Sequence, residues 1–178
     1  MSEFEFLSVL ISIIFGLALT HVLSGAVRSV YAGFSTETHL VYAAFFIQVL
    51  LLNWWVFFKW HTELEWSFDR FLILTLWAMT HYVMAVSVYP PGQAEVDDDR
   101  RSSWFLWAFI AVAFADITIT SMRGDLFRPW FYLPFVLHYV VLSLVAITVN
   151  TPTIHRFTSW WFLSITVIWA LVVRRLLS

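Results

Sequence analysis

Six long apolar segments, separated only by short polar loops, constrain this chain more than any other feature. A window of about 19 residues, which suits membrane-crossing helices, predicts them. Each is about long enough to cross a ~30 Å hydrocarbon layer as a helix. The predicted spans are 4–26, 40–58, 71–89, 104–122, 130–149 and 157–173. Because no stretch remains for a separate soluble domain, residues 1–178 are predicted to form a single transmembrane domain, an all-α polytopic membrane helix bundle.

The composition supports the lipid bilayer as the solvent of this chain. Of its 178 residues, 61% are hydrophobic and 12% are charged, whereas a soluble domain carries roughly 25% charged residues. So few polar residues could not cover one soluble globule. The net charge of −2 argues against nucleic acid as a partner, because phosphate binding needs a basic face. Cysteine is absent, which excludes disulfides and thiolate metal sites.

Ionisable residues stand near the middle of three of the predicted spans: His81, Asp116 and His138. Such residues are costly in lipid and usually mark function. A rise of ~1.5 Å per residue puts all three at similar depth, so they could meet. His21 lies closer to an interface.

Two further polar residues could support this cluster. Asn53 lies in the second span, and Thr120 follows Asp116 by one helical turn. Hydrogen bonds between helices would join them into one buried polar network.

Three functions fit a polar cluster of this kind. The best supported is a proton- or cation-linked channel or small transporter, with Asp116 as the proton or ion acceptor, His81 and His138 as relay or gating groups, and His21 as an exit-side partner. The second is a non-catalytic interaction or assembly subunit. The third is a haem- or metal-binding membrane protein, which would use imidazoles from facing helices.

An enzyme is not predicted. The chain has no His-Glu-x-x-His metalloprotease helix and no recognisable nucleophile, which intramembrane hydrolysis would need. No metal ion or other cofactor is required by the best supported function, and haem enters only with the third.

The first span carries a row of small residues that recurs at every fourth position. Such a row lies along one face of a helix and lets two backbones approach closely, which stabilises helix pairs in lipid. The row consists of Ser8, Ser12, Gly16, Thr20 and Ser24. It predicts close packing, either within the bundle or between subunits. The chain is expected to form a homo-oligomer, and other membrane subunits are further candidate partners.

The run from Gly16 to His21, together with Gln48 and the triplet Asn53-Trp54-Trp55, resembles the small six-span bacterial inner-membrane proteins of uncharacterised function. The resemblance implies a multi-pass protein of a bacterial inner (plasma) membrane and carries no activity with it. Six of the ten basic residues fall on the side that holds both termini and four on the other. That imbalance favours cytoplasmic termini.

Overall fold

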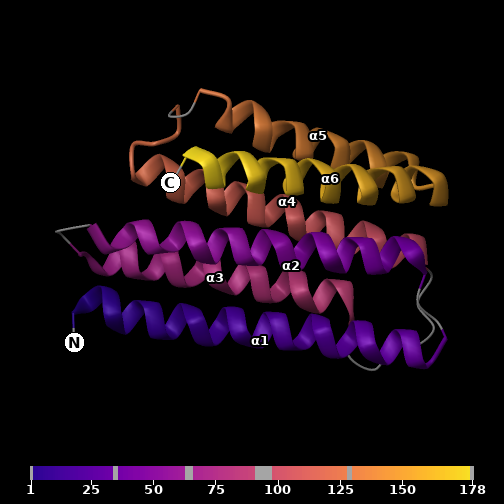
Figure 1. The fold of residues 1–178 in the computed structure, drawn as a ribbon, viewed down its shortest axis with the longest axis horizontal. Helices are drawn as coiled ribbons and strands as arrows, with labels where there is room; N and C mark the ends of the chain where they lie inside the picture. The colour runs from indigo at the N-terminus through magenta and orange to yellow at the C-terminus, as the bar shows by residue number, and fades with distance from the viewer. Residues whose placement is uncertain (1, 34–35, 63–65, 91–97, 128–129, 177–178) are drawn as a thin grey trace.

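A computed structural model describes residues 2–33, 36–62, 66–90, 98–127 and 130–176, with the side chains at 59, 62, 98–101 and 172–176 not described. These residues form six long α-helices and one short 3₁₀ helix, η1, and no β-strand (Figure 1). The elements are α1 (Glu3–Tyr31), α2 (Glu37–Phe57), η1 (Phe58–Thr62), α3 (Phe68–Val88), α4 (Asp98–Met122), α5 (Tyr132–Val149) and α6 (Pro152–Leu176). The all-α prediction is confirmed, and each helix covers most or all of its predicted span.

Five of these helices, α1 to α5, are long and apolar enough to cross a membrane. This is consistent with a membrane protein. Within the described residues α6 is not among them, and its first half carries Pro152, His155 and Arg156 between its apolar residues. The sixth span therefore stays a prediction.

Polar side chains fix where the first three helices begin. Ser2 and Glu5 form a capping box, in which the Glu5 amide donates to Ser2 Oγ at 3.2 Å and the Ser2 amide donates to the Glu5 carboxylate at 2.8 Å. Thr36 caps α2 and Ser67 caps α3 in the same way, each by accepting a backbone N–H. These side chains satisfy amides that a helix leaves without an internal partner.

A left-handed residue links the last two helices. Asn150 follows α5 with φ of 46°, a conformation that asparagine tolerates better than other residues with a Cβ. Its Oδ1 accepts hydrogen bonds from Ser103 Oγ at 2.9 Å and from His155 Nε2 at 3.1 Å. The turn therefore ties together α4, α5 and α6.

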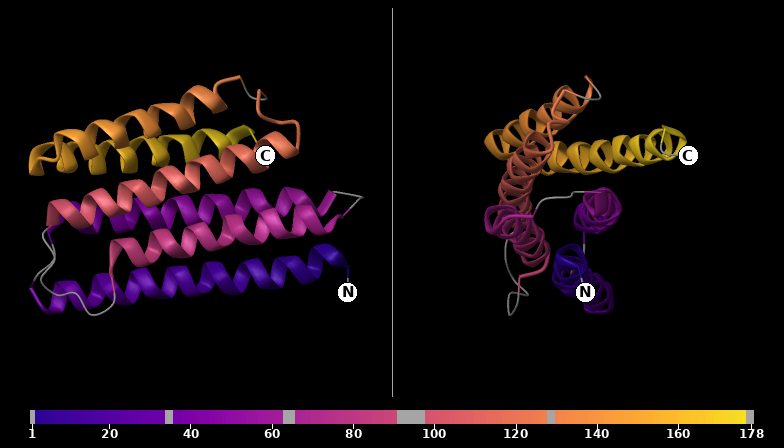
Figure 2. Two further views of the ribbon diagram at one scale, coloured as in Figure 1. Left: turned by 180° about the vertical axis from the view of Figure 1, so that it is seen from behind. Right: turned by 90° about the vertical axis from the view of Figure 1, so that its left-hand side faces the viewer.

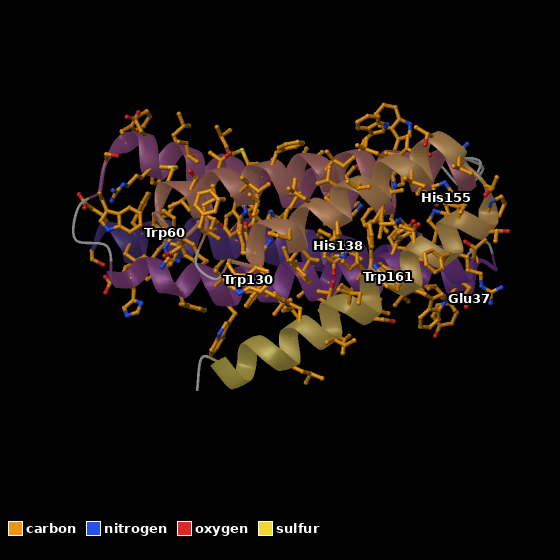
Figure 3. The ribbon with its side chains drawn as sticks, turned by 90° about the horizontal axis from the view of Figure 1, so that it is seen from above. Glu37, Trp60, Trp130, His138, His155 and Trp161 are labelled. Carbon is orange, nitrogen blue, oxygen red and sulfur yellow. The ribbon has the colours of Figure 1, made fainter. Side chains whose placement is uncertain are left out.

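The helices form two rows of three, α1-α2-α6 and α3-α4-α5 (Figure 2). Within this arrangement α3 packs between α1 and α4, and α2 packs along α6. Towards its C-terminal end α6 leans away from the other helices (Figures 2 and 3).

The middle of the bundle is filled by aromatic rings from both rows, which we call the aromatic cluster. The centroid of the Phe45 ring lies 5.2 Å from those of Phe109 and Phe162, 6.0 Å from that of Tyr139 and 6.5 Å from that of Phe105. All five side chains are buried. Rings at these separations add pair energies to the packing of α2, α4, α5 and α6.

The row of small residues on α1 is not the face that packs into the bundle. The buried residues of α1 are Leu7, Ile11, Phe15, Ala18, Val22, Gly25 and Ser29, whereas Thr20 and Ser24 are exposed. A Cβ added at Gly16 would meet no atom within 4 Å. The prediction that this row packs closely within the bundle is therefore wrong at Gly16. The close approach between α1 and the end of α3 is made at Gly25 instead.

Candidate functional site

A cavity of about 320 Å³ lies between α2, α4, α5 and α6, and Trp77 of α3 also lines it. It extends from the helix ends on the side of the termini, where Arg123 and Asp125 line it, to Phe45 and Phe109 of the aromatic cluster. Most of its walls are aromatic or aliphatic. This combination of an apolar wall and a few polar groups is typical of small-molecule sites.

Two acidic residues, Asp116 and Asp125, line the cavity, and Asp116 is bound by a chain of two hydroxyl groups. Tyr132 Oη donates to Asp116 Oδ2 at 2.7 Å, and Thr120 Oγ1 donates to Tyr132 Oη at 3.0 Å. Thr120 lies one turn after Asp116, so both face α5. The predicted support of Asp116 by Thr120 is thus present, but it acts through the phenol.

The second carboxyl oxygen of Asp116, Oδ1, accepts no hydrogen bond from the described residues. The indole N–H of Trp77 is directed at the same carboxyl group, although its geometry falls short of a hydrogen bond. The carboxyl group of Asp116 thus lines the cavity with one oxygen bound to Tyr132.

His81 is fully buried, and both of its ring nitrogens are used. Its Nδ1 donates to the Trp77 carbonyl at 2.9 Å, so in the neutral ring Nε2 is the acceptor and takes the Asn53 amide N–H at 2.8 Å. The rings of Phe15 and Trp77 each lie 5.0 Å from the imidazole. The predicted polar role of Asn53 is thus found at His81, on the contact between α2 and α3.

The other two histidines are bound elsewhere. His138 Nδ1 donates to the Phe135 carbonyl, and its ring lies 4.1 Å from that of Tyr139. His21 Nε2 donates to the Tyr89 carbonyl at 2.8 Å, which ties α1 to the end of α3. Neither of these histidines lines the cavity.

The predicted meeting of His81, Asp116 and His138 is therefore not supported. Among the described residues no hydrogen bond joins any two of them, and α4 separates the helices that carry the two histidines (Figure 2). Trp77 provides the nearest link, because its carbonyl binds His81 and its indole faces Asp116.

The described residues also hold no group of three or more His, Asp or Glu side chains placed to bind a metal ion. The haem or metal hypothesis gains no support from the positions of His81 and His138.

Basic and acidic groups at the mouth of the cavity are already paired. Arg123 forms an ion pair with Asp125 at 3.4 Å, and its guanidinium lies 5.5 Å from the centre of the Trp60 ring. Figure 3 shows Trp60 at this end of the molecule. Within the described part of the chain, no basic side chain forms an ion pair with Asp116.

At the opposite end of the bundle, polar contacts join the helix ends. Glu37 of α2 forms an ion pair with Arg156 of α6 at 2.9 Å and accepts a hydrogen bond from Trp160 Nε1 at 3.0 Å. Glu37 and His155 mark this end in Figure 3, far from Trp60. Together with the contacts of Asn150, these bonds hold α2, α4 and α6 together on the side away from the cavity.

Sequence reasoning missed Tyr132, Trp77 and Arg123 as cavity residues. Tyr132 stands at the very start of α5, so its backbone lies nearer the end of the bundle than that of Asp116, and the length of the phenol brings its hydroxyl to the carboxylate. Depth counted on the backbone does not reveal such a pair. Side-chain length added to backbone depth would have suggested it.

Comparison with protein-family models, with curated proteins and with solved structures gave no match. The resemblance to small bacterial inner-membrane proteins therefore stays a prediction.

Proposed function

We propose that this protein is a proton- or cation-linked membrane transporter in which Asp116 carries the transported proton or ion. The observation that carries the proposal is the carboxyl group of Asp116 inside a cavity lined mainly by apolar side chains, which ends at Phe45 and Phe109 within the bundle. A carboxylate in surroundings of low polarity must be protonated, hydrated or paired with a cation. Binding or release of a proton or cation at Asp116 therefore changes the net charge inside the cavity.

A cavity that ends within the bundle favours a transporter over an open channel. The cavity stops at Phe45 and Phe109, and the bonds of Glu37 and Asn150 lie beyond the aromatic cluster. A channel needs a continuous polar path, whereas a transporter exposes its site to one side at a time. The cavity corresponds to a site open towards the termini.

In this proposal the residues divide into two groups. Asp116, Tyr132 and Thr120 form the ion-carrying unit, because they are joined by hydrogen bonds inside the cavity. His81 and His21 are positioning residues, because their hydrogen bonds join α2 to α3 and α1 to α3. This replaces the relay role that the sequence suggested for the histidines.

The test is proton uptake into proteoliposomes that contain a pH-sensitive dye, with a proton gradient or a potassium diffusion potential as the driving force. We expect uptake with the wild type and none above empty liposomes with Asp116→Asn. Asp69→Asn is the matched control, because Asp69 is an exposed carboxylate in the first turn of α3. Wild-type uptake equal to that of empty liposomes would overturn the proposal.

We also propose that the protein lies in a bacterial inner membrane with cytoplasmic termini, so that the cavity opens to the cytoplasm. The chain contains no cysteine, so a single introduced cysteine can show which side of the membrane it faces, without labelling at any other residue. Ser121→Cys, at the exposed end of α4, should resist a membrane-impermeant maleimide in intact cells and react in inverted vesicles. Reaction in intact cells would reverse the orientation.

A second candidate function is an assembly subunit that uses α1 as its contact surface. The open space at Gly16 favours it, as do the neighbouring side chains of Ile13 and Leu17, which are 55% and 56% exposed. Gly16→Leu should then reduce the oligomer mass in detergent, whereas Asp116→Asn should not. A monomeric wild type would exclude this function for a homo-oligomer.

A further inference from the structure

We propose that the ligand of the cavity is a hydrophobic organic cation, held by Asp116 between aromatic rings. The inference rests on the proposed function, since it names the substrate class of the same cavity. It goes further in excluding inorganic ions and organic anions as the main ligand.

The charge of the cavity selects a cation. Asp116 lines the interior, and no basic side chain among the described residues forms an ion pair with it. Arg123, the basic residue of the lining, already pairs with Asp125 and packs on Trp60 at the mouth. An anion would meet an unpaired carboxylate inside and a neutralised guanidinium outside, whereas a cation would complete an ion pair in surroundings of low polarity.

The walls select an organic cation over a metal ion. Alkali and alkaline-earth ions need a shell of about six oxygen ligands, and the cavity is lined mainly by rings and aliphatic side chains. Three of these rings form a continuous wall on α5 and α6. The Phe135 ring stacks on Trp169 with centroids 4.1 Å apart and meets Tyr139 edge-on at 5.1 Å.

Aromatic faces attract cations through their quadrupoles, and recognition of quaternary ammonium groups by such rings is a recurring use of this attraction. The volume of about 320 Å³ lies within the range of small-molecule pockets. A cation with its own apolar or aromatic groups would therefore fill the cavity and bury its charge next to Asp116.

The experiment is equilibrium binding of radiolabelled tetraphenylphosphonium to the purified, full-length protein in detergent. Tetraphenylborate, which has nearly the same shape and the opposite charge, is the matched control ligand. We expect saturable binding of the cation and no saturable binding of the anion. Asp116→Asn should weaken binding of the cation about tenfold or more, since it removes the charge partner.

Three variants keep the result interpretable. Asp116→Glu retains the charge and should retain part of the binding, which separates charge from misfolding. Phe135→Leu removes one ring and should weaken binding severalfold, and Asp69→Asn should bind as the wild type does. Equal binding of cation and anion, or full binding by Asp116→Asn, would overturn the inference.

Failure of this inference is distinguishable from failure of the proposed function. Proton uptake that depends on Asp116, without binding of tetraphenylphosphonium, would support the transporter and reject an organic cation as its ligand. Binding that depends on Asp116, without any proton uptake, would support the cation site and reject the transport function.

Discussion

Gly25 of α1 lies directly against the ring of Tyr89 at the end of α3, so that a Cβ added at position 25 would fall 2.6 Å from the Tyr89 Cβ. One turn earlier, His21 donates to the Tyr89 carbonyl. Two residues on the same face of α1 thus contact Tyr89: Gly25 packs against its ring, and His21 binds its backbone carbonyl.

We expect Gly25→Ala to lower the free energy of unfolding by about 1–3 kcal/mol, because the new methyl group overpacks the contact with Tyr89. The matched control is Gly16→Ala, where the methyl group enters open space and alanine raises helix propensity. The measurement is thermal unfolding in detergent. Equal melting temperatures for the two variants would contradict the packing described at Gly25.

The hydrogen bond between Asn53 and His81 predicts coupled effects on stability. Asn53→Leu and His81→Leu should each destabilise the protein, because each leaves a buried polar partner unsatisfied. The double variant should cost less than the sum of the two, with a coupling energy of about 1 kcal/mol, as for other hydrogen bonds between membrane helices. Unfolding of the four proteins in detergent completes the cycle, and strictly additive losses would show that the bond contributes nothing.

Tyr132→Phe should slow proton uptake about tenfold while leaving the fold intact. The substitution keeps the ring and removes the hydroxyl that joins Thr120 to Asp116, a loss of about 1.4 kcal/mol. Thr120→Val removes only the outer member of the chain and should slow uptake less. The comparison needs uptake and melting temperature together, because a merely structural role would change both in parallel. Wild-type uptake by Tyr132→Phe would remove Tyr132 from the ion-carrying unit.

Two substitutions at Asn150 distinguish the cost of the left-handed backbone conformation from the loss of side-chain hydrogen bonds. Asn150→Gly and Asn150→Ala both lose the bonds to Ser103 and His155, but only alanine also carries the cost of the left-handed conformation, about 1–2 kcal/mol. We therefore expect stability to decrease from wild type to Gly to Ala in thermal unfolding. An alanine variant as stable as the glycine variant would contradict the positive φ at this position.

The positions of the helices along the chain could be predicted from this sequence, whereas the rotation of each helix about its axis could not. Hydropathy located the helices because lipid requires long apolar runs. The same uniform apolarity leaves no polar face to show which side of a helix is buried. On α1 the predicted row through Gly16 and the buried row through Phe15 differ by one residue, which is a rotation of about 100°.

The candidate site illustrates the same limit. Asp116 and Thr120 were found because their spacing on one helix is fixed by the helical repeat. His138 was grouped with Asp116 on depth alone, and it points instead to its own backbone at Phe135. Tyr132 and Trp169 were not singled out, because their roles depend on how α5 and α6 are turned towards α4.

The position of the aromatic cluster has an electrical consequence. A cavity that admits water up to Asp116 would bring the potential of the near solution into the protein, so that most of the membrane voltage would fall across the rings around Phe45. Moving one elementary charge through the full voltage is worth about 2.3 kcal/mol per 100 mV. A charge exchanged between Asp116 and the near side would cross little of that field, and one passed beyond Phe45 would cross nearly all of it. Release on the far side, rather than loading, would then be the voltage-sensitive step.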